Sequence, residues 1–450
     1  MKIPDKAPTI VEAINNLSPD RAHIIFQHAQ TPLPDGRYLH WHDLKYREPP
    51  DGLTREEWWT AILLARASTL QWLPLLDKQG NPFQFSTPSP VLIDLHCIDR
   101  DAAGQLHSVA GSALEVDKNS QRYLLSSLIE EAITSSQLEG ASTTRQVAAA
   151  MLQTGRKPRN HSETMIFNNY RTMEHLRSLK KENLTPNLVL ELHRMLTQDT
   201  LENPEDVGRL RQDNGIHIIH PGTETTLHIP PDYKELPERL ERLCKFANMD
   251  ETDSPFVHPV LRAILLHFMI GYDHPFVDGN GRTARALFYW SLARSGYWLM
   301  EYTSISHILR KAPAQYMKAY LYTETDGNDT TYFLLHQLRT IRRSITALHE
   351  YIDRTLREQK ETQQLLAASP KLRTAFNHRQ VSLLTHALKH PQASYRVDAH
   401  QRSHNVVYQT ARSDLLQLHE LGLLEKGKQG NAYVFFAPED LRDRLTALAR

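Results

Sequence analysis

One short segment of the 450-residue chain combines the residue types needed to bind a phosphate and to move a proton. Residues 274–285 have the sequence HPFVDGNGRTAR, with an apolar helical pattern before them and a second one after them. The glycines therefore fall at a helix N-terminus, where backbone N–H groups lack partners and the helix dipole is positive. Such a terminus binds anions, and Gly279 and Gly281 would let the backbone approach a phosphate closely.

Charged and polar side chains of the same segment could complete this site. Asn280 can donate a side-chain hydrogen bond, and Arg282 and Arg285, three residues apart on one helical face, can reach further phosphates. Asp278 is an oxygen ligand of the kind that holds Mg²⁺ against phosphate oxygens. His274 can accept a proton from an incoming hydroxyl. The segment therefore predicts a phosphate site with its own base.

A plain Gly-Asn-Gly turn between two helices would explain the glycines without any function, and for that tripeptide alone this interpretation is favoured. The pattern H-x-F-x-D-G-N-G-R-x-x-R, however, specifies eight positions together. At ordinary residue frequencies, its chance occurrence in a chain of this length is on the order of 10⁻⁸. A structural turn therefore does not account for the whole segment.

The segment resembles the defining loop of the Fic (filamentation induced by cAMP) family of protein adenylyltransferases, H-x-F-x-(D/E)-G-N-G-R-x-x-R. The resemblance implies a mainly α, Fic-type helical core with a β-hairpin flap. It also implies transfer of AMP from ATP to a Ser, Thr or Tyr hydroxyl of a protein, the enzyme itself included, with release of pyrophosphate. By this resemblance His274 deprotonates the hydroxyl and Asp278 binds Mg²⁺. The positions that it assigns to ATP are Gly279, Asn280, Gly281, Arg282, Arg285 and, near the adenine, Tyr316.

One agreement and one departure refine that resemblance. A kinase-like branch has a lysine in the place of Gly281, so the glycine favours adenylyl over phosphoryl transfer. The family often has a second tyrosine after the one at Tyr316, and here Met317 replaces it.

A second pattern lies before the core, where Ser135-Ser136-Gln137-Leu138-Glu139-Gly140 ends an apolar helix expected over about 123–140. By itself the pattern fits a helix with an exposed Glu and a glycine cap. It resembles the inhibitory motif (S/T)-x-x-x-E-(G/N) of one class of the family. The resemblance implies that Glu139, on the helix with Ser135, pairs with Arg285 and keeps ATP out of its reactive pose. Some members with this glutamate also remove AMP by hydrolysis, so a de-AMPylase or a bifunctional enzyme is an alternative.

Between Gly208 and Pro231 two β-prone runs, 216–219 and 225–229, predict a hairpin. Its borders resemble those of the family's flap, which docks the target's backbone as an added strand. The docking residues that this implies are Asn214, Gly215, Ile216, His217 and Ile218. We expect the hairpin histidines, His217, His220 and His228, to be solvated rather than to bind zinc. We expect His193, His258 and His267 to be packed core histidines.

The helical period predicts a domain over residues 116–365 around these motifs. Further helices are expected at 162–179, from Thr185-Pro186 onward, and at 234–248, 259–271, 282–295, 304–323 and 330–364. Residues 1–115, rich in Pro and Trp, predict a small mixed cap, and a boundary is expected near 367–370.

Residues 371–450 predict a winged helix-turn-helix, with helices at 379–390, 397–405 and 408–421 and strands at 424–426 and 433–436. The residues expected to contact DNA or a partner begin the third helix: Tyr408, Gln409, Thr410 and Arg412. This module has 12 Lys and Arg against 7 Asp and Glu, a modest excess for DNA binding. Winged helices also bind proteins, so a DNA-binding regulator with a nucleotide-sensing Fic-like domain is a further alternative.

The composition limits the remaining possibilities. Equal numbers of basic and acidic residues, 52 each, argue against a chain that coats nucleic acid, and 40% hydrophobic residues are typical of a globular protein. Cys97 and Cys244 stand alone, without a CxxC pair, which favours a reducing, cytoplasmic compartment. No apolar stretch is long enough to span a bilayer, so no membrane role is expected. The family resemblance also suggests a homodimer.

Overall fold

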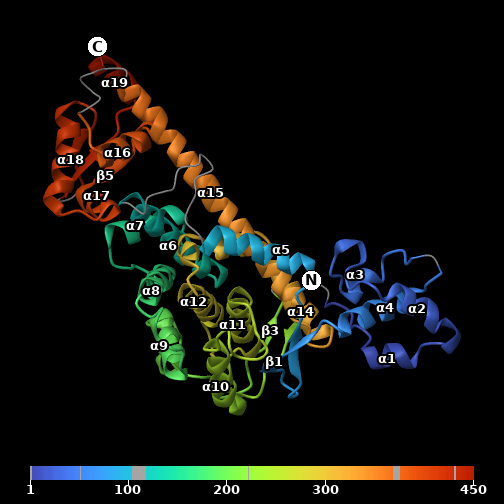
Figure 1. Cartoon of the computed structure of the whole chain (residues 1–450). Coiled ribbons are helices and arrows are strands. Elements are labelled where there is room, and N and C mark those ends of the chain that lie inside the picture. Colours follow the sequence, from blue (N-terminus) through green and yellow to red (C-terminus); the bar gives the residue numbers. More distant parts are fainter. Residues whose placement is uncertain are drawn as a thin grey trace. The chain divides into compact units, whose positions relative to one another are not determined.

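The computed structural model describes residues 3–50, 52–103, 118–220, 222–367, 375–429 and 432–449, and these residues are mainly α-helical, as the sequence predicts (Figure 1). The chain divides into two compact units. The first consists of Met1–Gly104, Glu130–Thr143 and Arg159–Ile345, and the second of Gln105–Ile129, Thr144–Pro158 and Thr346–Arg450. The expected N-terminal cap thus belongs to the same unit as the motif loop, and the last segment of the second unit begins at Thr346, inside a long helix that extends to Ala367.

The N-terminal part of the first unit mixes helices with a two-stranded antiparallel sheet. Its elements are α1 (Ile10–Asn15), α2 (Ala22–His28), α3 (Trp41–Leu44), α4 (Arg55–Ala67), β1 (Gln71–Leu76), β2 (Pro82–Phe85) and α5 (Ser89–Ile98). Trp59, Ile25 and Leu44 are fully buried in one hydrophobic cluster between α2, α3 and α4. Short 3₁₀ turns lie at 19–21, 34–36, 204–206, 233–235 and 298–302, and a π turn lies at 99–103.

Helices surround the motif loop in the remainder of the first unit. They are α8 (His161–Leu176), α9 (Pro186–Thr197), α10 (Leu236–Ala247), α11 (Pro259–Asp273), α12 (Asn280–Arg294), α13 (Ile305–Lys311) and α14 (Pro313–Thr325). Two long helices, α6 (Lys118–Leu138) and α15 (Thr331–Ala367), run from one unit into the other. The hairpin consists of β3 (Ile218–Ile219) and β4 (Thr226–His228). Figure 1 shows α11 and α12 side by side, and these two helices pack against each other along their lengths.

Two local differences from the sequence prediction have simple causes. The helix expected over 304–323 is divided into α13 and α14 at Ala312, because Pro313 has no N–H to donate and starts a new helix instead. The hairpin strands are shorter than expected, with pairing limited to Ile218 with His228 and Ile219 with Thr226.

A buried ion pair fixes the end of α11, directly before the motif loop. Arg239 of the amphipathic helix α10 donates from Nε and Nη2 to Asp273 Oδ1 at 2.9 and 2.7 Å, and both side chains are 6% exposed. Its Nη1 and Nη2 also donate to the carbonyls of Asp77 and Leu76. One guanidinium therefore joins α10, α11 and the end of β1.

Replacing Arg239 with Ala is expected to lower the free energy of unfolding by about 3–5 kcal/mol, because the buried Asp273 carboxylate loses its cation. Urea unfolding followed by circular dichroism measures this loss. The matched control is Arg242→Ala on the same helix, where the guanidinium pairs with the exposed Glu238 and should contribute less than about 1 kcal/mol. Equal losses in the two variants would contradict the assignment.

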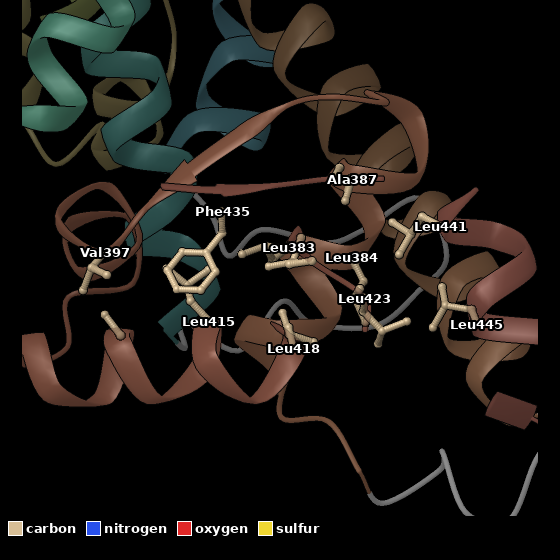
Figure 2. Close-up of a cluster of buried hydrophobic side chains, with 13 residues drawn as sticks. Leu383, Leu384, Ala387, Val397, Leu415, Leu418, Leu423, Phe435, Leu441 and Leu445 are labelled. Carbon is tan, nitrogen blue, oxygen red and sulfur yellow. The ribbon is translucent and has the colours of Figure 1, made fainter. Parts of the chain in front are cut away.

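The second unit contains helix α7 (Arg145–Thr154) and the C-terminal module. The elements of the module are α16 (His378–Lys389), β5 (Ser394–Arg396), α17 (Val397–His404), α18 (Tyr408–Glu420), β6 (Glu425–Gln429), β7 (Ala432–Phe436) and α19 (Leu441–Ala449). The sheet is antiparallel with strand order β5-β7-β6. Figure 2 shows its core, in which Phe435 of β7 and Leu415 and Leu418 of α18 face Leu383 and Leu384 of α16.

The module has the element order of a winged helix-turn-helix, with β5 and α19 added to the elements expected from sequence. β5 is only three residues long, too short for an alternating pattern to stand out. Helix α7, also unexpected, has Thr144 as its N-cap and ends at Gly155, whose φ of +64° is the left-handed conformation that glycine adopts readily. Among the described residues, no helix is both long and apolar enough to cross a bilayer.

Candidate active site

The motif loop joins α11 to α12 and is closed by its own side chains. His274 ends α11 with a left-handed φ of +43°, and Gly279 precedes α12 with a φ of +84°. The buried Asn280 amide accepts from the Phe276 N–H at 3.0 Å and donates to the Phe276 carbonyl at 2.9 Å. Asn280 thus clamps the loop, and its expected role as a side-chain donor to a phosphate stays a prediction.

His193 of α9 fixes the motif loop through two hydrogen bonds to backbone groups. Its Nδ1 accepts from the Gly208 N–H at 3.1 Å, and its Nε2–H donates to the Asp278 carbonyl at 2.9 Å. Its ring stacks on Phe276 with centroids 3.7 Å apart. Burial lowers the pKa of His193 to about 4, so the ring is neutral at pH 7 and can hold both contacts. The sequence predicts a packed histidine here, but nothing in the sequence connects it with the loop.

His274 has the properties of a general base. Its Nδ1 lies 3.3 Å from the Gly271 carbonyl, and an Nδ1–H that donates there leaves the Nε2 lone pair free to accept a proton. Arg211 fixes the backbone at this point, because its Nε donates to the His274 carbonyl and its N–H donates to the Pro275 carbonyl. Arg211, which lies three residues after Gly208 at the start of the predicted flap, therefore also supports the base.

The acidic limb of the pH–rate profile is expected below pH 6.5. Burial lowers the pKa of the His274 imidazole from its usual value near 6.5, and the base must be neutral to accept a proton. Activity should therefore stay constant as the pH falls to 6.5 and decline only when it passes through the lower pKa of the folded protein. Rates of label transfer between pH 5 and 8 measure this, and a decline centred above pH 6.5 would contradict it.

A cavity of about 200 Å³ lies beside this base. The sequence-predicted residues that line it are His274, Asn280, Gly281, Arg285, Glu139, Tyr316 and Ile218. Residues from the end of α6 onward, from the hairpin, from the motif loop and from α14 thus meet at one pocket, although the sequence separates them widely.

The two side chains that the family resemblance pairs, Glu139 and Arg285, are in contact across this pocket. Arg285 Nη2 donates to Glu139 Oε1 at 2.9 Å, and its Nε donates to Ser135 Oγ at 2.7 Å. The Arg285 side chain is 3% exposed and that of Glu139 is 24% exposed. A Cβ on Gly281 would lie 2.1 Å from Glu139 Oε1, so the absence of a side chain at Gly281 makes room for this carboxylate.

Arg282 and Asp278 form a second pair, outside the pocket lining among the described residues. The fully buried Arg282 donates to the Leu196 carbonyl at 3.0 Å and to Asp278 Oδ2 at 3.3 Å. Arg282 Nε is buried without a partner among the described residues. In this structure the side chain orients the half-exposed Asp278 carboxylate, and the expected contact of Arg282 with outer phosphates stays a prediction.

Tyrosines of α14 form another wall of the pocket. The Tyr316 hydroxyl lies 2.7 Å from His267 Nε2 and 3.3 Å from the Tyr320 hydroxyl. Tyr320 also lines the pocket and was missed from sequence, although it lies one helical turn after Tyr316. A Cβ on Gly271 would lie 2.3 Å from the Tyr320 hydroxyl, so this glycine of α11 admits the second tyrosine. Met317 lines the pocket beside them.

The hairpin differs most from its prediction. Asn214 Oδ1 accepts from the Tyr233 N–H at 2.9 Å, and the Gly215 N–H donates to Asp213 Oδ1 at 2.8 Å, so both residues shape the turn into the hairpin. Ile216 and His217 lie before β3. Of the five predicted docking residues Ile218 lines the pocket, together with Leu227 and His228 of β4.

The expectation of a solvated His228 is wrong. This side chain is 7% exposed; its Nδ1 lies 2.7 Å from Glu324 Oε2, and its Nε2 lies 2.7 Å from the Tyr272 carbonyl. Because β4 packs against α11 and α14 through these contacts, its histidine is fixed inside the protein. Among the described residues, no group of three or more His, Cys, Asp or Glu side chains could hold a metal ion.

In the second unit, the predicted contact residues do begin a helix. Tyr408, Gln409 and Arg412 of α18 are exposed and Thr410 is half-buried. Tyr408 is 53% exposed and the preceding Val407 is 68% exposed, which is unusual for large apolar side chains in one turn.

Comparison with known proteins identifies relatives of this region. Residues 183–292, which contain the hairpin and the motif loop, match a family model described as the Fic/DOC family. A relative from Nematostella vectensis named protein adenylyltransferase Fic is 25% identical over 304 residues, which cover 65% of this chain and 61% of the relative. Proteins of the same name from Drosophila mojavensis and Drosophila ananassae are 29% identical over 198 residues and 33% identical over 119 residues. These two matches cover 44% and 26% of this chain, and 37% and 22% of the relatives.

The chain thus spans less than two thirds of the length of these relatives. Among solved structures, a Fic family protein from Desulfovibrio desulfuricans is similar with a TM-score of 0.48 and 16% identity, over 78% of this chain and 97% of that one. Fic-1 from C. elegans is similar with a TM-score of 0.45 and 17% identity, over 78% of this chain and 90% of that one.

Proposed function

We propose that this chain, whose residues 183–292 form a Fic domain, is a protein adenylyltransferase that transfers AMP from ATP to a hydroxyl of a target protein or of itself. The observation that carries the proposal is the pocket in which His274, Gly281 and Arg285 meet. A base, a glycine at a helix N-terminus and a buried guanidinium are the groups that an attack on a phosphate requires.

In this mechanism the α-phosphate lies against the N-terminus of α12, and Arg285 neutralises charge on the phosphates behind it. His274 Nε2 takes the proton of a Ser, Thr or Tyr hydroxyl as its oxygen attacks the α-phosphorus. A new P–O bond forms to the target, the bond to the β-phosphate oxygen breaks, and pyrophosphate leaves. The Tyr316 and Tyr320 rings line the part of the pocket that would receive the adenine.

The residues also fit a Mg²⁺ ion. Asp278 is half-exposed, and its carboxylate is fixed by the Gly279 N–H and by Arg282, so it presents one oriented carboxylate. Mg²⁺ is commonly held by one or two carboxylates, with water and substrate phosphates as the other ligands. The ion would supply charge neutralisation at the phosphates, and the single carboxylate of Asp278 is sufficient to hold it there.

Glu139 would restrain this reaction. Its carboxylate occupies the guanidinium of Arg285 at 2.9 Å, and that guanidinium is needed for the phosphates of ATP. The target backbone would dock along β3, where Ile218 leads into the pocket, and a homodimer would bring a second copy as a target for auto-adenylylation.

Mass spectrometry tests the proposal directly. The Glu139→Gly variant is incubated with ATP and a cell lysate, and peptides that carry AMP on Ser, Thr or Tyr are expected in the lysate or in the enzyme. A complete absence of AMP-modified peptides with this variant would overturn the proposed activity.

Hydrolytic removal of AMP is the second candidate, because the Glu139 carboxylate lines the same pocket as His274 and could orient a water. An adenylylated substrate distinguishes the two. If removal is the activity, the unmodified enzyme releases AMP and the Glu139→Gly variant does not.

The winged-helix module is proposed to contact duplex DNA through the first turn of α18 and the β6-β7 wing. Lys426 Nζ and Lys428 Nζ lie 4.1 and 5.7 Å from the centroid of the exposed Tyr433 ring, so the wing presents two cations and an aromatic ring. A gel shift of the full chain should show binding that weakens steeply with salt. Failure to bind any duplex at low salt would leave a protein partner as the function of this surface.

A further inference from the structure

A buried carboxylate, Glu131, connects α6 to α13 two helical turns before Glu139. It accepts three hydrogen bonds from the start of α13: from Ser304 Oγ at 2.8 Å, from Ser306 Oγ at 2.5 Å and from the Ser306 N–H at 3.2 Å. Its side chain is almost completely buried, and this burial raises the pKa of Glu131. A carboxylate in such a place is unfavourable unless donors surround it, so these contacts are specific.

Glu131 shares one face of α6 with the residues that reach Arg285. Glu131, Ser135 and Glu139 are spaced by four residues, which places successive side chains one above the other on a helix. Ser135 contacts Arg285 through both its Oγ and its carbonyl, and Glu139 contacts it through Oε1. The same face of the segment is thus fixed at α13 and at α12.

Glu139 and Gly140, which follow the end of α6, make fewer buried contacts than Glu131 does. Glu139 lies just beyond the last residue of α6, Leu138, and Gly140 follows with a φ of +94°. Its carboxylate is 24% exposed, whereas Glu131 is 2% exposed. The position of Glu139 therefore depends on how the helix before it is held.

The division of the chain into two units makes the position of Glu139 depend still more on the contacts of residues 130–143. Residues 130–143 belong to the first unit, but the segments on both sides of them, up to Ile129 and from Thr144 onward, belong to the second unit. The inhibitory segment is therefore not continuous with the rest of the first unit at either end. Its own side chains must hold it there, and the buried Glu131 accepts three hydrogen bonds from the start of α13.

We propose that Glu131 is a positioning residue for autoinhibition: by fixing α6 to the start of α13, it holds Glu139 on Arg285. The inference rests on the proposed function, because it assigns a regulatory role within the same site. Glu131 acts through Glu139 and takes no part in the transfer of AMP.

The test compares auto-adenylylation of Glu131→Gln with that of the unmodified enzyme and of Glu139→Gly. Glu131→Gln keeps the shape of the side chain but replaces one acceptor by a donor that faces the serine hydroxyls. We expect labelling from ATP to rise about fivefold, the effect of losing one ordinary hydrogen bond, and less than in Glu139→Gly. Ser306→Ala removes the same contact from α13 and should act in the same direction if the Gln variant fails to fold.

A double variant distinguishes positioning from general structural support. In the Glu139→Gly background, Glu131→Gln should cause no further change, because the carboxylate that it positions is absent. Hydrogen exchange of residues 130–143 should be faster in Glu131→Gln than in the unmodified protein. The matched control is Glu301→Gln, the same change at a carboxylate that pairs with Arg177, and it should leave labelling unchanged.

The outcomes are separable. If the Glu139→Gly variant incorporates no label from ATP at all, the proposed function fails. If Glu139→Gly is active while Glu131→Gln and Ser306→Ala label at the unmodified level, or if Glu131→Gln lowers labelling in both backgrounds, the positioning role is overturned. Unchanged hydrogen exchange of residues 130–143 would also overturn it.

Discussion

Replacing Glu139 with Gly is expected to raise auto-adenylylation about 10- to 100-fold. The carboxylate holds Arg285 Nη2 at 2.9 Å, and a hydrogen bond to a charged group contributes about 1.5–3 kcal/mol, with each 1.4 kcal/mol worth about tenfold. Its removal frees the guanidinium for the phosphates of ATP and clears the space in front of Gly281. Incorporation of label from α-³²P-ATP into the enzyme measures the change.

The control for this variant is Gln137→Gly, two residues earlier. It introduces the same flexible backbone at the end of α6 and removes the Gln137 contact with the Thr143 carbonyl, but it leaves the carboxylate in place, so its labelling should rise far less than that of Glu139→Gly. An equal rise in both variants would mean that loosening of the helix, rather than loss of the ion pair, causes the activation. No rise in Glu139→Gly would remove the inhibitory assignment.

Replacing His274 with Ala in the Glu139→Gly background is expected to reduce label transfer about 10²- to 10⁴-fold, the usual contribution of a general base. The imidazole is neutral because burial lowers its pKa, and its Nδ1 contact with Gly271 leaves Nε2 available to the target hydroxyl. The loss should appear in the rate at saturating ATP, since the guanidinium of Arg285 and the N-terminus of α12 remain in place.

His23→Ala is the matched control, because this exposed histidine of α2 lies outside the pocket lining. It should transfer label at the rate of its Glu139→Gly parent. A His274→Ala variant that kept more than about a tenth of that rate would be incompatible with a general base, whose contribution starts at about 10².

The parts of this site that lie in continuous sequence could be predicted from it. Residues 274–285 contain the base, the glycines and the arginines in one stretch, and the apolar period places a helix on either side of them. The pairing of Glu139 with Arg285 came from resemblance, since nothing in the spacing of residues so far apart indicates contact.

What the sequence missed depends on contacts between distant segments. No sequence pattern indicated the supporting roles of His193, Arg211 and Glu131, because each acquires its role from a backbone group or hydroxyl that another element brings to it. Nor does the motif indicate the loop contacts that its own side chains make. The Asn280 amide donates to the Phe276 carbonyl, and the Arg282 guanidinium donates to the Leu196 carbonyl. In both cases the geometry of the closed loop decides which acceptor lies within reach.

Secondary structure was missed where segments are short or polar. α7 and β5 have ten and three residues, which leaves too few positions for a period to be distinguished from chance. The break at Pro313 was visible in the sequence, because proline starts helices more readily than it continues them, but the apolar pattern runs across it.

The origin of the transferred group tests the central claim most directly. The Glu139→Gly enzyme is incubated in parallel with α-³²P-ATP and γ-³²P-ATP, and the protein is separated from free nucleotide. Adenylyl transfer by His274 predicts that label from the α position becomes covalently bound and that label from the γ position is released in pyrophosphate. Covalent label from the γ position, or from neither, would contradict the account.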